Sequence, residues 1–150
     1  PRLRIDLMDI GISFANVNWL IVMAATTLGF VLGGFWYSPV LFGRFLPSLM
    51  SSLKSGGDSP AGSTRYLAGI FTVSFALLWF AAAFLAGLIG PQATASEGLY
   101  LGLAVGLFFV VPAHAIAAMF GARPIQIIFI NGAYFAVCLA AMGAIIALWS

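Results

Sequence analysis

Residues 67–90 read LAGIFTVSFALLWFAAAFLAGLIG and contain no charged side chain. A helix needs about 20 mainly apolar residues to cross the hydrocarbon core of a bilayer, so this run predicts a transmembrane helix, which we place at residues 66–90. Three further windows of this kind lie at residues 17–37, 98–120 and 124–149. The sequence therefore predicts an all-α fold, a bundle of four transmembrane helices that forms one membrane domain over residues 1–150.

The overall composition leads to the same conclusion. The chain is 63% hydrophobic and only 7% charged, far below the charged fraction of about 25% in soluble domains. The spans use most of its length, so we expect no soluble catalytic domain. A net charge of +2, with the basic residues spread out, argues against nucleic acid as a partner. Residues 3–14 alternate apolar and polar positions at helical spacing, which fits either an interfacial helix or a frayed tail.

The basic residues set the expected topology. With four spans, both termini share one side of the membrane, which carries Arg2 and Arg4. The opposite side carries four basic residues, Arg44, Lys54, Arg65 and Arg123. Because cytoplasmic loops are enriched in Lys and Arg, we expect a multi-pass protein of the bacterial inner membrane with both termini outside, in the periplasm.

Small residues recur at helical spacing in the predicted spans. Gly29 and Gly33 are four residues apart in the first span, before the aromatic pair Trp36 and Tyr37, which we expect at the membrane interface. A stricter series in the third span comprises Gly98, Gly102 and Gly106. Small residues let helix backbones approach closely, so these five glycines predict helix packing or a partner interface.

Proline residues affect two of the predicted spans. Pro39 follows Ser38 and ends the first span, because a proline disfavours the helical conformation of the residue before it. Pro112 lies within the third span and is expected to kink that helix and free a carbonyl group.

The acidic residues are absent from the centres of the predicted spans. They lie in loops or at a span edge: Asp6, Asp9, Asp58 and Glu97. Ion-coupled transporters usually need a carboxylate within the membrane, so this distribution argues against coupled transport. One histidine and one cysteine cannot supply the three or four protein ligands of a zinc site, and we expect neither a metal site nor catalytic residues.

His114 is the one titratable side chain well within a predicted span. At a similar depth, roughly 9–15 Å from the arginine-rich side by helical rise, the other spans carry polar residues: Asn131, Ser74 and Thr27. Together they predict a polar layer. In one interpretation His114 and Asn131 form a cross-helix hydrogen bond, which adds about 0.6 kcal/mol. In others, His114 binds a quinone, pigment or lipid, relays protons, or acts as the base of a membrane enzyme.

Three stretches resemble an uncharacterised bacterial membrane family, domain of unknown function 1761. They are VNWL at 17–20, GFVLGGFWYSPVLFG at 29–43 and IFINGAYF at 128–135. The resemblance implies four transmembrane helices and supplies no activity.

Two functions remain open from the sequence. The leading expectation is a non-enzymatic accessory subunit that packs against other integral membrane subunits of a larger complex, such as a photosynthetic or respiratory one, and shapes its lipid or quinone surroundings. The alternative is a small membrane carrier or binding protein for a hydrophobic ligand, a quinone, pigment or lipid, held in the polar layer around His114.

Overall fold

A computed structural model describes residues 14–15, 17–45 and 64–149 of the chain. These residues form helices and turns and no strand, and four continuous helical segments are long and apolar enough to cross a membrane. The helices are α1 (Trp19–Trp36), α3 (Thr64–Leu88), a third segment made of α4 (Ala95–Val105), η3 (Gly106–Val110) and α5 (Val111–Phe120), and α6 (Ile125–Leu148); a short 3-10 turn, η1, covers Gly43–Phe45. The expectation of a four-helix membrane bundle is confirmed.

Side-chain caps define where two of these helices begin. The Asn18 side chain accepts a hydrogen bond of 3.1 Å from the backbone N–H of Leu20 and caps α1. Thr94 and Glu97 form a capping box, in which the Glu97 carboxylate accepts the backbone N–H of Thr94 at 2.7 Å. Such a box satisfies two N–H groups that the helix itself leaves unpaired, and it starts α4 at Ala95, three residues before the expected position.

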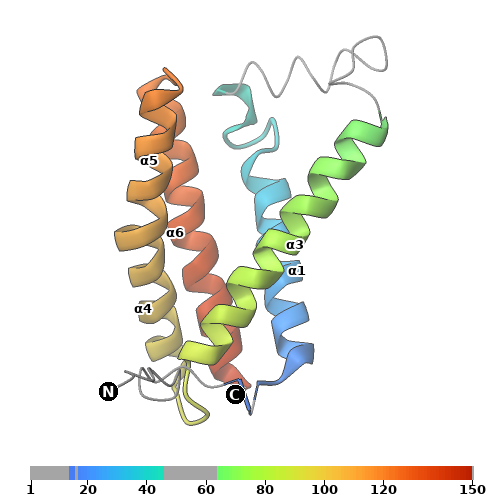
Figure 1. Cartoon of the computed structure of the whole chain (residues 1–150), viewed down its shortest axis with the longest axis vertical. Coiled ribbons are helices and arrows are strands. Elements are labelled where there is room, and N and C mark those ends of the chain that lie inside the picture. The colour runs from blue at the N-terminus through green and yellow to red at the C-terminus, as the bar shows by residue number, and fades with distance from the viewer. Residues whose placement is uncertain (1–13, 16, 46–63, 150) are drawn as a thin grey trace, which may run out of the picture.

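The helix α6 is the central element of the bundle and contacts all the others. Figure 1 shows α6 beside α4 and α5, whereas α3 crosses the molecule at an angle and its first turns stand away from α5. The buried core gathers where α1, α3 and α6 meet, and its largest fully buried side chains are Leu85, Met142, Val22, Thr26 and Cys138.

The contact between α4 and α6 depends on glycine. A Cβ atom at Gly98 would collide with the carbonyl oxygen of Gly143, and one at Gly102 with the carbonyl oxygen of Leu139. At Gly106 it would lie 2.8 Å from the Cα atom of Ala136. The two backbones therefore touch directly, and the glycine series of the third span is used inside the bundle.

Aromatic rings join α1 to α3. Trp19 stacks on Trp79 with ring centroids 5.8 Å apart. Farther along, the Phe30 ring meets Phe71 and Phe75 edge-on, at 6.0 and 5.6 Å. Edge-to-face and offset pairs are the favoured aromatic geometries. These contacts pack α3 against α1 along most of the length of α1.

Pro112 does not break the third helix. A proline in an α-helix collides with the carbonyl group four residues earlier, and here the turn before it is widened into a π-helix over Gly106–Val110, closed by a hydrogen bond from the N–H of Val111 to the carbonyl oxygen of Gly106. The third helix thus accommodates Pro112 through a π turn with one extra residue.

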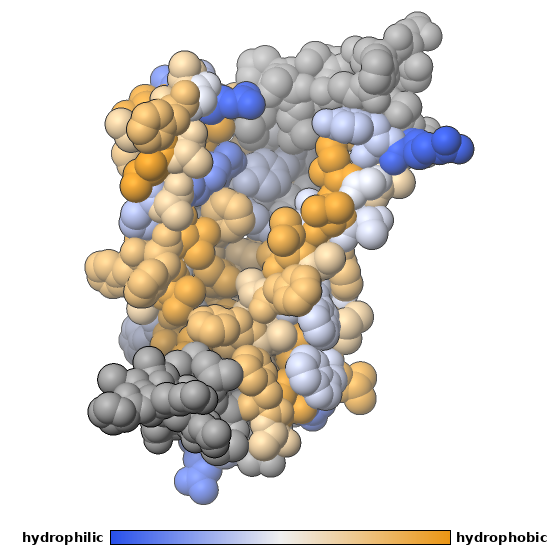
Figure 2. All heavy atoms as spheres, in the orientation of Figure 1, coloured by the Kyte–Doolittle hydropathy of each residue, from blue (hydrophilic) through white to orange (hydrophobic). Residues whose placement is uncertain are grey.

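The outer surface is that of a multi-pass membrane protein. Figure 2 shows hydrophobic residues over the middle of the molecule and hydrophilic ones gathered towards its two ends. Only 11% of the α3 window is buried within the bundle. The proposed interfacial helix over residues 3–14 and Lys54 fall outside the described residues, apart from Phe14.

Candidate functional site

The glycines of α1 make room for Tyr134 of α6. The Tyr134 hydroxyl group donates a hydrogen bond of 3.1 Å to the carbonyl oxygen of Gly29. A Cβ atom at Gly33 would lie only 2.9 Å from that hydroxyl oxygen. Gly29 also faces the sulfur atoms of Cys138 and Met142, each 3.0 Å from the position of a Cβ. The side of α1 that carries Gly29 and Gly33 therefore packs against α6.

The end of α1 is joined to α6 by two further hydrogen bonds. Trp36 donates from Nε1 to the carbonyl oxygen of Ile130 at 3.2 Å, and the Tyr37 hydroxyl donates to Asn131 Oδ1 at 3.0 Å. Both aromatic residues are half-buried. This pair, which we expect at the membrane interface, also docks α1 on α6.

His114 of α5 contacts the same stretch of α6. Its ring centroid is 5.6 Å from that of Phe135, and its Nε2 atom is buried without a hydrogen-bond partner. Asn131 and Phe135 are four residues apart and share a face of α6. Contrary to the first interpretation of the sequence, His114 and Asn131 are not hydrogen-bonded to each other: His114 Nε2 has no partner, and the Asn131 side-chain oxygen accepts from Tyr37.

Aromatic rings connect the two sides of this region. The Tyr134 ring lies 5.3 Å from the Tyr37 ring and 5.3 Å from the Phe135 ring, measured between centroids. We call the five residues His114, Asn131, Phe135, Tyr37 and Tyr134 the His114 cluster. It combines an apolar aromatic surface with an unpaired imidazole nitrogen and an amide group, an arrangement suited to a lipophilic molecule with a polar head.

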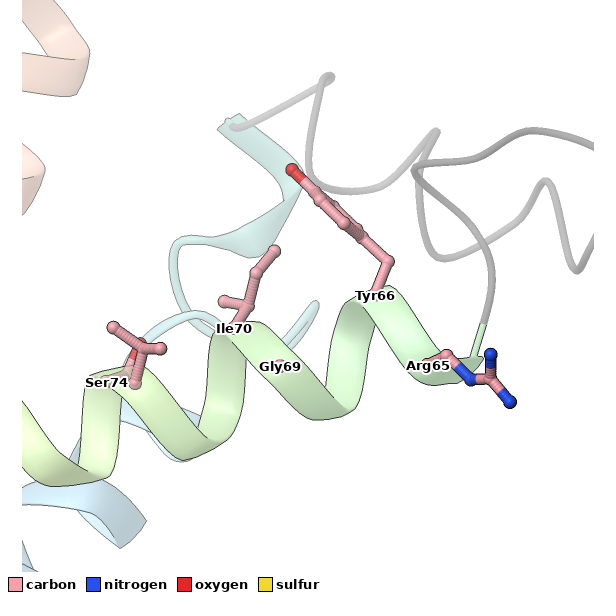
Figure 3. A pocket seen from close by; sticks show the side chains of 6 residues that line it. Arg65, Tyr66, Gly69, Ile70 and Ser74 are labelled. Atoms are coloured by element: carbon pink, nitrogen blue, oxygen red, sulfur yellow. The ribbon is translucent and has the colours of Figure 1, made fainter.

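The other two members of the predicted polar layer lie elsewhere. Thr27 is exposed on α1, and its hydroxyl group donates to the carbonyl oxygen of Met23 on the same helix at 2.8 Å. Ser74 lies on α3, where it lines an open hollow (Figure 3). The expected layer is therefore divided between the His114 cluster and the α1–α3 pair.

The π turn directs His114 towards α6. His114 follows Gly106 by eight residues, which in an uninterrupted α-helix would place it about 80° around the axis from Gly106. The extra residue of the π turn offsets roughly this rotation, so that His114 and Gly106 lie on the same side of the helix. Gly106 faces Ala136 of α6, and His114 contacts Phe135 one residue earlier on that helix.

Sequence reasoning missed the roles of Tyr37 and Tyr134 in this site. Tyr37 was assigned to the membrane interface, and Tyr134 was one of many aromatic residues in the spans. Within the described part of the chain, no three side chains of His, Cys, Asp or Glu gather where they could hold a metal ion.

Comparison with known proteins shows the family of the chain. The model of a family described as protein of unknown function (DUF1761) matches residues 20–147. No curated protein and no solved structure matches the chain. The match covers nearly the whole of the described helices, from α1 to α6, including all three segments that meet in the His114 cluster, so the chain belongs to the DUF1761 family.

Proposed function

We propose that this protein binds a lipophilic molecule with a polar head inside the membrane, at the His114 cluster. The observation that carries the proposal is the buried, unpartnered Nε2 atom of His114. A buried polar atom without a partner costs about 1–3 kcal/mol, and the penalty is relieved when a ligand supplies the missing hydrogen bond.

The chemistry of the cluster indicates the kind of molecule. Depending on the tautomer, a neutral imidazole nitrogen accepts a hydrogen bond from a hydroxyl group or ligates a metal, or it donates a hydrogen bond to a carbonyl oxygen. The Phe135 and Tyr134 rings offer apolar contact beside it. A quinone, a pigment or a lipid combines such a head with an apolar body, and the proposed role is binding or carriage of that molecule.

A second candidate is the accessory subunit of a larger membrane complex. Large apolar side chains point outward on the third helix, with Phe108 74%, Phe109 73% and Phe120 91% exposed. Such a surface fits either lipid or a neighbouring subunit. The glycines no longer favour this candidate, because α6 packs against those of the third span and Tyr134 against Gly33 of α1. Membership of a photosynthetic or respiratory complex stays a prediction.

One experiment separates the two candidates. The tagged protein is extracted with its surrounding lipid from its native membrane in copolymer discs and examined by native mass spectrometry. A binding protein emerges alone or as a homo-oligomer and carries an enriched small molecule. An accessory subunit emerges with other integral membrane subunits at fixed stoichiometry, and that result would refute the leading proposal if no small molecule is present.

We further propose the bacterial inner membrane as the location, with both termini outside. The first residue of α1 and the last of α6 lie at the same end of the bundle (Figure 1), and Arg44, Arg65 and Arg123 belong to the opposite end. Positive residues favour the cytoplasmic side. Alkaline phosphatase fused after α6 should therefore be active and green fluorescent protein dark; the reverse pattern contradicts this orientation.

A further inference from the structure

A hollow of about 510 Å³ lies along the first turns of α3, apart from the His114 cluster. It is lined by Arg65, Tyr66, Gly69, Ile70, Val73 and Ser74. Its volume is within the range of about 300–1,000 Å³ that is typical of small-molecule sites. Figure 3 shows Tyr66 and Ile70 directed to one side of α3, while the guanidinium group of Arg65 extends outward at the start of the helix.

The polarity of the residues that line the hollow changes along α3. Arg65 and Tyr66 lie at the charged end, followed by Gly69, Ile70 and Val73, which present hydrogen or hydrocarbon only, and Ser74 lies at the far end. From Arg65 to Ser74 the helix rises about 14 Å, close to the roughly 15 Å depth of one leaflet of the hydrocarbon core. The hollow thus has the length of one acyl chain, an apolar middle and a charged end where a headgroup would lie.

Charge favours an anionic headgroup. Among the described residues, the end of the molecule at which α3 begins carries Arg44, Arg65 and Arg123 and no carboxylate, since Glu97 belongs to the opposite end. A guanidinium group binds a phosphate through paired, charge-assisted hydrogen bonds.

We propose that this hollow is a binding site for one anionic phospholipid, whose phosphate is held by Arg65 and one of whose acyl chains lies over Gly69, Ile70 and Val73. Gly69 is central to it, because a side chain at that position fills the hollow. A Cβ atom at Gly69 meets no atom within 4 Å, so the substitution Gly69→Leu blocks the site without a collision inside the bundle.

The chain supplies matched controls for both features. Gly34 is also an exposed helical glycine at which a Cβ atom meets nothing within 4 Å, so Gly34→Leu adds the same side chain on α1. Arg123 is exposed at the same end of the molecule but on the turn between α5 and α6, so Arg123→Gln removes the same charge away from the hollow.

The test is native mass spectrometry of protein equilibrated with equimolar phosphatidylglycerol and phosphatidylcholine of identical acyl chains. The wild type should retain one phosphatidylglycerol in preference to phosphatidylcholine. Arg65→Gln, which loses the charge-assisted hydrogen bond to the phosphate, should lower the retained phosphatidylglycerol about ten-fold. Gly69→Leu should lower retention of both lipids, whereas Arg123→Gln and Gly34→Leu should match the wild type. Equal losses in Arg65→Gln and Arg123→Gln would show general surface attraction only and overturn the proposal, as would unchanged retention in Gly69→Leu.

Discussion

The Tyr37 hydroxyl group lies 3.0 Å from Asn131 Oδ1 and donates a hydrogen bond to it, although the two residues are 94 positions apart in the chain. They belong to GFVLGGFWYSPVLFG at 29–43 and IFINGAYF at 128–135, two of the stretches on which the family resemblance rests. These stretches therefore form one contact between α1 and α6, and this contact holds Asn131 on the α6 face that also carries Phe135, the neighbour of His114.

Removing the Tyr37 hydroxyl group should weaken the bundle modestly. A cross-helix hydrogen bond within a membrane protein contributes about 0.6 kcal/mol and at most about 1.7, so we expect Tyr37→Phe to lower the free energy of unfolding by this amount. Asn131→Leu should have a similar effect, and the double variant should lose less than the sum of the two. Unfolding in mixed detergent measures all three; fully additive losses would show that the bond contributes nothing.

The α4–α6 contact should tolerate substitution of its glycines far less well. A Cβ atom at Gly102 collides with the Leu139 carbonyl oxygen, and overpacking of this kind costs about 1–3 kcal/mol or more. We expect Gly102→Ala to expose the thiol of Cys138, which is 1% exposed in the folded chain, to a membrane-permeant maleimide at lower denaturant concentration. Gly34→Ala is the control and should behave like the wild type; equal labelling of the two variants contradicts direct backbone contact.

Pro112 should be the cause of the π turn. Deleting Phe108, whose side chain is exposed, removes the extra residue and forces the segment towards a regular α-helix. With Pro112 present, the ring then collides with the preceding turn, at a cost of about 3 kcal/mol. Combining the deletion with Pro112→Ala should restore the part of the stability that this collision removes, as followed by thermal unfolding. If the deletion lowers the stability equally with Pro112 and with Pro112→Ala, a feature other than Pro112 causes the π turn.

Hydropathy and length were sufficient to predict the four helices, because both are local properties of the chain. The start of α4 was misplaced by three residues, although Thr94 and Glu97 have the spacing of a capping box. That local pattern was available in the sequence and indicates a helix start at Ala95.

The candidate site was predicted only in part, because depth along a helix does not reveal rotation about its axis. His114 and Asn131 share a region of the bundle, but Thr27 and Ser74, at similar depth, face other surfaces. The π turn, which rotates His114 towards α6, depends on how a proline is accommodated against a neighbouring helix. Similarly, the spacing of Gly98, Gly102 and Gly106 predicts a close contact without identifying the helix that makes it.

The most direct measurement is the small-molecule content of discs prepared from native membranes, compared between the wild type and His114→Phe by liquid chromatography and mass spectrometry. Phenylalanine keeps the ring contact with Phe135 and removes the unpaired nitrogen, so the fold should be as stable as the wild type or more stable by about 1 kcal/mol. The account predicts a molecule enriched with the wild type and with the control Thr27→Val, and lost from His114→Phe. Equal amounts in His114→Phe and the wild type, or no enriched molecule in either, would contradict it.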